Sequence, residues 1–169
     1  MTNSAIAPRP APIDSEAFRD VAGRFASGLT ILTSASPDGP CGTTVSAVSS
    51  LSLEPPMMLV CLNRNSSIHD AVLARGAFGI NILAADQAAI ARQFARRDSD
   101  KFAGVAHRPS RHGVPLLDGT LASIACEIES TATGGTHTVL LGRVLEAVTR
   151  EIEPLVYYRG GFGEFAATS

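Results

Sequence analysis

The sequence carries little charge and no long apolar run, and both deficits exclude classes of function. Charged residues make up 18% of the 169 residues and the formal net charge is −2, so no basic field is available to attract a polyanion. The longest apolar runs, such as MMLVCL at 57–62, are far shorter than the roughly 20 residues that cross a bilayer. The first residues also lack the basic and apolar regions of a secretory signal. We therefore expect a cytoplasmic protein that binds neither nucleic acid nor membrane.

Catalytic and metal-binding motifs are equally scarce. The three cysteines, Cys41, Cys61 and Cys126, are widely spaced and form no Cys-x-x-Cys pair, which favours free thiols in a reducing compartment. The four histidines form no helical metal pair, and we expect no metal site. Glu127 and Glu129 share one face of an expected strand, but a solvated face explains them better than an acid/base pair. A globular chain without such groups can use a bound cofactor to carry its chemistry.

The pattern of apolar residues predicts a mainly β domain with flanking helices. We expect a flexible proline-rich tail at 1–13 and one domain at 14–169. Expected helices begin at Asp14 (ending at Ser27-Gly28), run over 67–74, and run over 86–96 with Asp86 as N-cap. Expected strands cover 29–35, the hydroxyl-rich segment from Cys41, 57–63, 77–83, 121–130, 136–150 and 154–159, and 97–119 is expected to be a loop. Short turns between strands favour an antiparallel barrel or sandwich.

One nucleotide-binding motif is present but lies in the wrong context. The segment GFGEFA at 161–166 matches Gly-x-Gly-x-x-Ala, yet only three residues follow it. The helix and βαβ unit that give this motif its function therefore cannot form. We interpret the match as chance.

The segment CGTTVSAVSSLSLEPP, residues 41–56, combines many hydroxyls with no charge before Glu54 and no bulky side chain before Leu51. Small uncharged residues let a flat heteroaromatic ring approach the main chain, whose N–H groups and hydroxyls can meet the polar edge of the ring. They equally suit a strand that packs tightly against another strand or a subunit. The composition alone favours neither interpretation.

Two further segments have both a structural and a functional interpretation. Ser67 and Asp70 form a capping-box pattern at a helix start, where Ser66 and Ser67 could also meet a phosphate. Arg96 and Arg97, between two phenylalanines, suit either a helix C-terminus or a clamp on an anion. His137 opens an apolar strand after a glycine turn, a place where sheets present side chains to ligands.

Five segments together resemble the flavin reductase-like family, the small reductase components of two-component flavin-dependent monooxygenases. They are FASGLTILTS, GTTVSAVSSLSLEPPMMLVCLN, FGINILAADQAAIARQFARRDSDKF, GVPLLDGTLASIACEI and GGTHTVLLGRV, and the resemblance spans Phe18 to Phe165. It implies a split β-barrel of the Greek-key antiparallel kind, a homodimer, FMN or FAD as cofactor, and NADH or NADPH as co-substrate. The implied flavin-binding residues are Thr44, Val45, Ser46, Ala47, Ser49, Ser50, Cys61, Leu62, Asn63, Ser66, Ser67, Phe94, Ala95, Arg96, Lys101 and Phe102.

The resemblance also implies a nicotinamide side. His137 falls in the position of the histidine of a Gly-Asp-His motif, and we take it as the catalytic residue, with Tyr157, Tyr158 and Arg159 near the same site. Two positions depart from the family pattern: Thr136 stands in place of the motif aspartate, and Ser46 stands where relatives often carry asparagine. A threonine supplies no carboxylate, so we infer no Asp–His pair.

The function implied is an NAD(P)H:flavin oxidoreductase that passes hydride to flavin N5 and supplies reduced flavin to a separate monooxygenase. Two alternatives stay open. One is an oxidoreductase of the same fold that keeps its flavin and acts on another substrate. The other is a flavin-binding or dimerisation module without catalytic activity.

Overall fold

The computed structural model describes residues 12–97 and 100–167, and antiparallel β-structure dominates it. The helices are α1 (Ser15–Gly23), α2 (His69–Arg75) and α3 (Ala88–Ala95). The strands are β1 (Ser27–Gly28), β2 (Thr30–Ser36), β3 (Gly39–Val45), β4 (Val48–Leu53), β5 (Pro56–Asn63), β6 (Ala77–Ile82), β7 (His107–Pro109), β8 (Pro115–Leu117), β9 (Ala122–Gly134), β10 (His137–Thr149), β11 (Leu155–Tyr158) and β12 (Gly161–Glu164). The mainly β, antiparallel class expected from the sequence is confirmed.

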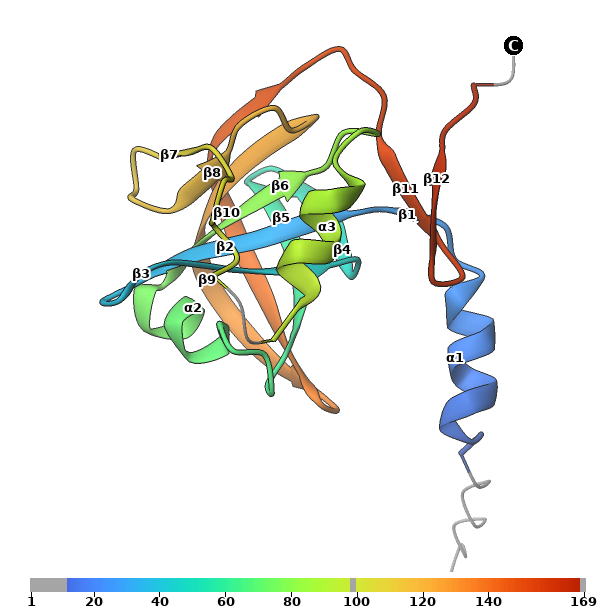
Figure 1. Ribbon diagram of the computed structural model, residues 1–169. Coiled ribbons are helices and arrows are strands. Elements are labelled where there is room, and N and C mark those ends of the chain that lie inside the picture. The colour runs from blue at the N-terminus through green and yellow to red at the C-terminus, as the bar shows by residue number, and fades with distance from the viewer. Residues whose placement is uncertain (1–11, 98–99, 168–169) are drawn as a thin grey trace, which may run out of the picture.

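Seven strands form one strongly curved sheet in the order β3-β2-β6-β9-β10-β5-β4 (Figure 1). The two outermost strands, β3 and β4, are neighbours in sequence, joined by Ser46 and Ala47. The sheet therefore curls until its edges approach, but no ladder joins β3 to β4 in the described residues, and the barrel is not closed by hydrogen bonds. This opening between the edges positions the site described below.

The interior of the curved sheet is a close-packed apolar core. Phe78 and Leu140 are fully buried, together with Leu32, Val60 and Ile80. A Cβ atom built on Gly142 would lie 2.5 Å from the ring of Phe78, so only glycine at this position lets the ring pack against β10. Strand β10, which begins at His137, is thereby packed against the core.

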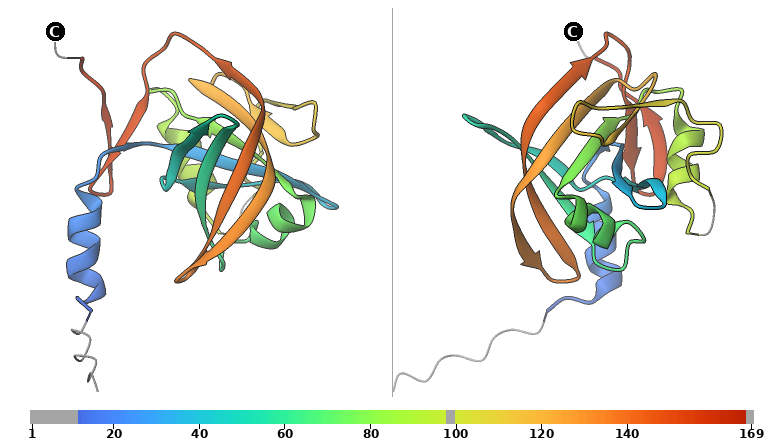
Figure 2. Two further views of the ribbon diagram at one scale, coloured as in Figure 1. Left: turned by 180° about the vertical axis from the view of Figure 1, so that it is seen from behind. Right: turned by 90° about the vertical axis from the view of Figure 1, so that its left-hand side faces the viewer.

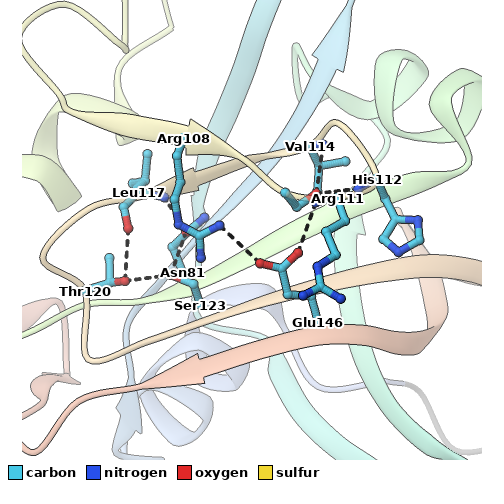
Figure 3. A network of polar contacts seen from close by, with 10 residues as sticks. Asn81, Arg108, Arg111, His112, Val114, Leu117, Thr120, Ser123 and Glu146 are labelled. Carbon is cyan, nitrogen blue, oxygen red and sulfur yellow. Dashed lines mark hydrogen bonds and ion pairs between the residues drawn. The ribbon is translucent and has the colours of Figure 1, made fainter.

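A buried polar network fastens the segment after α3 to the sheet (Figure 3). The amide oxygen of Asn81 accepts from the N–H of Leu117 at 2.7 Å, and its Nδ2 donates to the carbonyl of Ile31 at 3.1 Å. At the rim, the Glu146 carboxylate accepts from Arg108 Nη1 at 3.1 Å and from the N–H of Arg111 at 3.0 Å. Residues expected as a plain loop at 97–119 therefore include a two-stranded hairpin, β7–β8, that is docked on the body.

One part of the molecule projects from this body (Figures 1 and 2). We call it the arm: α1 and the three-stranded sheet β1-β11-β12. The arm is joined to the body through Leu155, which is buried with Leu29 and Leu83, and through the Arg92 guanidinium, which lies 4.9 Å from the ring centre of Phe162. No residue of α1 is buried.

Several expected element boundaries are wrong, each for a local reason. Asp14 is the N-cap of α1, as expected, but the helix ends at Gly23, and Ser27–Gly28 forms a strand that pairs with β11. The N-cap of α2 is Ile68 and that of α3 is Gln87, and neither makes a side-chain cap bond. The capping box and the Asp86 cap are thus not formed, because turns precede both helices. The hydroxyl-rich segment is two strands, since β3 pairs with β2 and β4 with β5.

The remaining expectations have mixed outcomes. The tail at 1–13 lies outside the described residues except for Pro12 and Ile13. The segment at 161–166 contributes strand β12 and no helix, which confirms that its glycine pattern is no dinucleotide motif. None of the helices formed by the described residues has the length and apolar character needed to cross a bilayer. Within the same residues, no three His, Cys, Asp or Glu side chains gather closely enough to hold a metal ion.

Candidate functional site

The opening in the sheet is a groove between β3 and β5. These strands share no ladder: β5 pairs with β4 only up to Val60, opposite Val48, and beyond this point it pairs only with β10. At the corner, the N–H of Cys61 donates to the carbonyl of Ala47 at 2.9 Å, and from there the strands diverge. The groove therefore begins where the chain leaves one edge of the sheet for the other.

The first part of the groove is a pocket of about 210 Å³ that we call the neutral pocket. Its lining residues are Thr43, Thr44, Val45, Ser46, Ala47, Cys61, Leu62, Asn63, Ser66 and His137. No Asp, Glu, Lys or Arg of the described part of the chain lines it. Eight of the residues expected at a flavin are thus brought together here with His137, expected on the nicotinamide side, and with Thr43, which the expected set omits.

The free edge of β3 supplies main-chain groups to this pocket. The carbonyl of Gly42 accepts from Lys101 Nζ at 3.1 Å, so it points away from β2. Since main-chain groups alternate along an antiparallel strand, the N–H and C=O of Thr44 lie on the same outer edge. Unpaired edge groups are available for hydrogen bonds to a ligand that lies alongside the strand.

The small residues of β3 have a second, structural cause. A Cβ atom on Gly42 would lie 2.6 Å from the ring of Phe94, and the Thr44 hydroxyl donates to the carbonyl of Ala91 at 2.7 Å. Helix α3 therefore packs directly on Gly42 and Thr44. Tight packing explains these two residues, whereas Thr43, Ser46 and Ala47 line open space. The packing interpretation of the hydroxyl-rich segment is thus confirmed for Gly42 and Thr44, and the ligand interpretation stays a prediction for the other three residues.

His137 stands at the far wall of the neutral pocket as the first residue of β10. In the sheet it lies opposite Asn63, and the preceding turn contains Gly135 at φ 57°, a conformation that favours glycine. The Thr136 hydroxyl lies 3.0 Å from His137 Nδ1. Arg64 holds the same turn, because its N–H donates to the Thr136 carbonyl at 3.1 Å and its guanidinium donates to the Gly135 carbonyl. Threonine at 136 therefore gives the imidazole a hydrogen-bond partner without a charge.

Beneath this wall lies His69, which sequence reasoning missed. It is 9% exposed, its Nδ1 donates to the Asp70 carboxylate at 2.9 Å, and its Nε2 lies 2.9 Å from the Thr138 hydroxyl. Its main-chain N–H donates to the carbonyl of Ser66 at 3.1 Å. His69 thus ties the turn at Ser66 to the strand that carries His137.

The groove continues into a second pocket of about 300 Å³, which we call the cationic pocket. It is lined by Thr43, Asn63, Asn65, Ser66, Ser67, Ala95, Arg96, Arg97 and Lys101. Three of these side chains are cationic, and no carboxylate of the described residues is among them. Asp70, whose charge would oppose an anion, instead points into solvent and contacts His69.

Helix α3 positions the cationic side chains. Arg96 is its C-cap, and Gln93 Nε2 donates to the carbonyls of Lys101 and Ala103 at 3.0 and 2.9 Å, which holds the next turn against the helix. Partial burial lowers the pKa of the Lys101 ammonium from its ordinary value. A phosphate in this pocket would oppose that shift, because an adjacent negative charge favours the protonated form.

Comparison with known proteins identifies the family. Residues 22–166 match the model of the flavin reductase like domain. The chain belongs to this family. It is 47% identical, over 91% of this chain and 83% of the relative, to the reductase component of 4-nitrophenol 4-monooxygenase/4-nitrocatechol 2-monooxygenase of Rhodococcus opacus.

Two solved structures of similar proteins share the architecture of this flavin reductase-like domain. Nitrilotriacetate monooxygenase component B from Mycobacterium thermoresistibile superposes with a TM-score of 0.86 at 37% identity, covering 89% of this chain and 86% of that one. The NADH:FAD oxidoreductase SgcE6 of Streptomyces globisporus gives a TM-score of 0.87 at 32% identity, covering 96% and 100%. Reductase components of two-component monooxygenases are thus its relatives.

The pockets of this flavin reductase-like domain fit the ring and the phosphate that all flavin nucleotides share. The neutral pocket offers small side chains and main-chain donors to a planar ring. The cationic pocket offers hydroxyls and positive charges to a phosphate. The neutral pocket alone is smaller than most small-molecule sites, which measure about 300–1,000 Å³. It shares Thr43, Asn63 and Ser66 with the cationic pocket, so the two form one groove.

Several expected site residues do not line this groove. Ser49 and Ser50 are exposed on β4, beyond the corner. Phe94 is fully buried, and its ring packs against Phe102 at 5.0 Å, so it supports the site from behind. Phe102 lies beyond the neutral and cationic pockets, in an adjoining pocket that Lys101 also lines.

The remaining expected residues lie on the arm. Tyr157 and Arg159 line a pocket against α1, and Tyr158 is 46% exposed. Arg159 adopts φ 50°, its N–H donates to the carbonyl of Gly23, and its guanidinium contacts Asp20. Within one chain these contacts hold Arg159 to the arm, away from the groove.

Two residues of the groove were missed, Thr43 and Asn65, and Arg97, considered above as part of an anion clamp, was left out of the expected flavin-binding set. Thr43 precedes an expected site residue, and Arg97 follows one. The signal was present in each case as a polar side chain next to a chosen residue. Only the observed geometry of the turn shows that both neighbours face the ligand space.

Proposed function

We propose that this protein is an NAD(P)H:flavin oxidoreductase that supplies reduced flavin to a separate monooxygenase component. The observation that carries the proposal is the groove between β3 and β5, in which an uncharged pocket adjoins a cationic one. Ring and phosphate of a flavin nucleotide need these two environments side by side. The reductase components among the relatives support the same function.

In this proposal the chain's own residues bind the flavin and orient it. The edge of β3 at Thr44 and the side chains of Ser46 and Asn63 hold the polar rim of the ring. Ser66, Ser67, Arg96 and Lys101 hold the phosphate. The bound flavin supplies the chemistry, because its N5 accepts hydride from a reduced nicotinamide.

His137 is the side chain nearest to the nicotinamide side in this proposal. Its ring is oriented by the Thr136 hydroxyl, and the turn is held by Arg64. Holding two rings at reacting distance and excluding water can lower the barrier to hydride transfer by several kcal/mol. The chain therefore needs no nucleophile of its own. His137 acts by contact with the nicotinamide and by closing the pocket wall.

We also propose a homodimer, argued from the arm. Helix α1 has nine residues and none is buried, although helices this short are marginal in water without packing. Phe18, Val21 and Phe25 are 60%, 63% and 84% exposed. A second copy that covers this face would stabilise the helix and bury these side chains. Sedimentation of the wild type and of a Phe18→Ser/Val21→Ser variant checks this: a monomeric wild type at micromolar concentration refutes the dimer.

Anaerobic mixing tests the reductase function directly. Purified protein, NADH or NADPH, and free FMN or FAD should bleach the flavin absorbance catalytically. Absence of bleaching with either nicotinamide, when flavin binding is intact, refutes the function and leaves the binding module. Flavin that stays bound at one equivalent through gel filtration favours the flavin-retaining oxidoreductase. The three free cysteines are consistent with work in the cytoplasm, which we propose as its location.

A further inference from the structure

Beyond the cationic pocket the groove opens into a third pocket of about 300 Å³. It is continuous with the cationic pocket, because Ser67, Arg97 and Lys101 line both. Lys101 lies between them, with its Nζ on the carbonyl of Gly42. The three pockets therefore follow one another along the free edge of β3, from Ala47 at one end to the β2–β3 turn at the other. The residues that line the third pocket are Ser36, Asp38, Pro40, Cys41, Gly42, Ser67, Ile68, Arg97, Asp100, Lys101 and Phe102.

The chemistry of the third pocket differs from that of both others. Asp38 and Asp100 bring carboxylates to it, whereas none lines the cationic pocket in the described residues. Carboxylates repel a further phosphate but accept hydrogen bonds from sugar hydroxyls or an exocyclic amine. The two cations lie only on the side shared with the cationic pocket. The charges thus suit an anion at the entrance and a neutral, hydroxyl-bearing group inside.

Phe102 adds an aromatic wall to this pocket. Its ring is half-buried and meets Phe94 and His107 edge-on, with ring centres 5.0 and 4.9 Å apart. These two contacts hold the ring of Phe102 in place. A purine base can stack on an aromatic ring that is held in this way.

We propose that the third pocket binds the adenosine half of FAD, so that this chain prefers FAD to FMN. The inference rests on the proposed function, since it extends the flavin of the neutral pocket. Arg97 and Lys101 then lie beside the pyrophosphate, the carboxylates of Asp38 and Asp100 beside the ribose or the base, and Phe102 beside the adenine.

The same adenosine diphosphate chemistry occurs in NADH and NADPH. The order of the pockets favours the flavin. The cationic pocket stands between the neutral pocket and the third pocket along one strand edge, so a single dinucleotide that enters with its flavin ring at Ala47 places its phosphates and adenosine in sequence. A nicotinamide must instead approach the exposed face of the flavin ring, on the side of His137.

Binding to the unmodified protein gives the first test. Titration with riboflavin, FMN and FAD without nicotinamide should give FAD the lowest dissociation constant, by about tenfold or more over FMN. ADP should displace FAD but leave riboflavin bound. Equal affinities for FMN and FAD, with no effect of ADP, refute the third-pocket assignment while the reductase function stands. Failure of all three flavins to bind refutes the proposed function itself.

A pair of matched variants gives the second test. Pro40→Trp fills the third pocket from the exposed edge of β3, and Pro37→Trp places the same side chain on the adjacent turn, outside the pocket. We expect Pro40→Trp to reduce the FAD-to-FMN affinity ratio to about one, a change of tenfold or more, and Pro37→Trp to leave the ratio unchanged. Asp38→Asn, which keeps the size of the side chain, should lower the ratio in the same direction.

Kinetics distinguish whether the third pocket binds the adenosine of the flavin or that of the nicotinamide dinucleotide. With FMN as acceptor, the KM for NADH and for reduced nicotinamide mononucleotide should both be unaltered by Pro40→Trp. A rise in the KM for NADH alone, with an unchanged FAD-to-FMN ratio, assigns the pocket to the nicotinamide dinucleotide and refutes the flavin assignment.

Discussion

The neutral pocket and the cationic pocket share a wall, yet different parts of the fold make them. The neutral pocket is built by strands that part from one another, and main chain and small side chains form its surface. The cationic pocket is built where α3 ends, and long side chains dominate it. The sheet therefore determines the shape of the neutral pocket, and the end of α3 supplies the charge of the cationic pocket. The two properties should therefore be separable by substitution.

The largest effect is expected from filling the neutral pocket. Ala47→Trp puts a large ring where the flavin ring would lie, so affinity for riboflavin, FMN and FAD should fall together by about 100-fold or more, roughly 2.7 kcal/mol. Flavin fluorescence titration measures it. Ser49→Trp, on β4 outside the pocket, is the matched control. Normal binding by Ala47→Trp would place the ring elsewhere.

A smaller effect, confined to phosphate-bearing flavins, is expected in the cationic pocket. Arg96→Gln removes one charge-assisted contact, so FMN affinity should fall about tenfold while riboflavin affinity is unchanged. In this variant the affinity for FMN should also depend less on salt concentration, because one ion pair is lost. Arg150→Gln, at the exposed residue that follows β10, is the control. An equal loss for riboflavin would show that Arg96 shapes the ring site instead.

A substitution at His69 tests the wall that the neutral and cationic pockets share, because the main chain of His69 bonds to Ser66 in that wall. His69→Ala leaves the Thr138 hydroxyl without its partner and opens a gap below Ser66, so the free energy of unfolding should fall by about 1–3 kcal/mol. Both FMN and riboflavin should bind more weakly, since Ser66 lines both pockets. Urea unfolding and flavin titration provide the two readings, with the exposed His112→Ala as control. An unchanged unfolding midpoint would contradict the bridging role.

The smallest effect is expected far from both pockets, at Glu146. The N–H of Arg111, aided by the Arg108 guanidinium, holds the pKa of the Glu146 carboxyl below its ordinary value. A depressed pKa stabilises the fold above the ordinary carboxyl pKa, and this contribution is lost as pH falls through the depressed value. Glu146→Gln should therefore lower stability slightly at pH 7 and not at strongly acidic pH. Urea midpoints measured at both pH values check the sign, and flavin affinity should not change.

The sequence predicts most of the strands well, because short apolar segments, many of them containing β-branched residues, are bounded by turn residues. It does not predict the break at Ser46–Ala47, where no glycine or proline marks the corner. The break arises from tertiary structure, since β3 finds its partner in β2 and β4 in β5. The sequence also could not show that α2 and α3 lack side-chain N-cap bonds. A serine or aspartate near a helix start gives the same sequence pattern whether or not its side chain bonds to the helix.

Much of the site could also be anticipated, with characteristic errors. Short polar segments at 44–47, 61–63 and 66–67 and the histidine at 137 do converge on one groove. Phe94 was misplaced because an aromatic residue beside arginines has the same pattern whether it faces a ligand or the core. Its buried position follows from its packing on Gly42, which lies 52 residues earlier and which no local pattern connects to it. The third pocket was invisible for the same reason, since it joins a hairpin turn to residues beyond α3.

The free edge of β3 has a consequence for the folding and solubility of the chain. An uncovered strand edge is a template on which strands of other molecules can add, and such additions start aggregation. Lys101 lies across this edge at Gly42 and places a charge where an incoming strand would have to dock. The same lysine that attracts a nucleotide thereby discourages the wrong kind of partner.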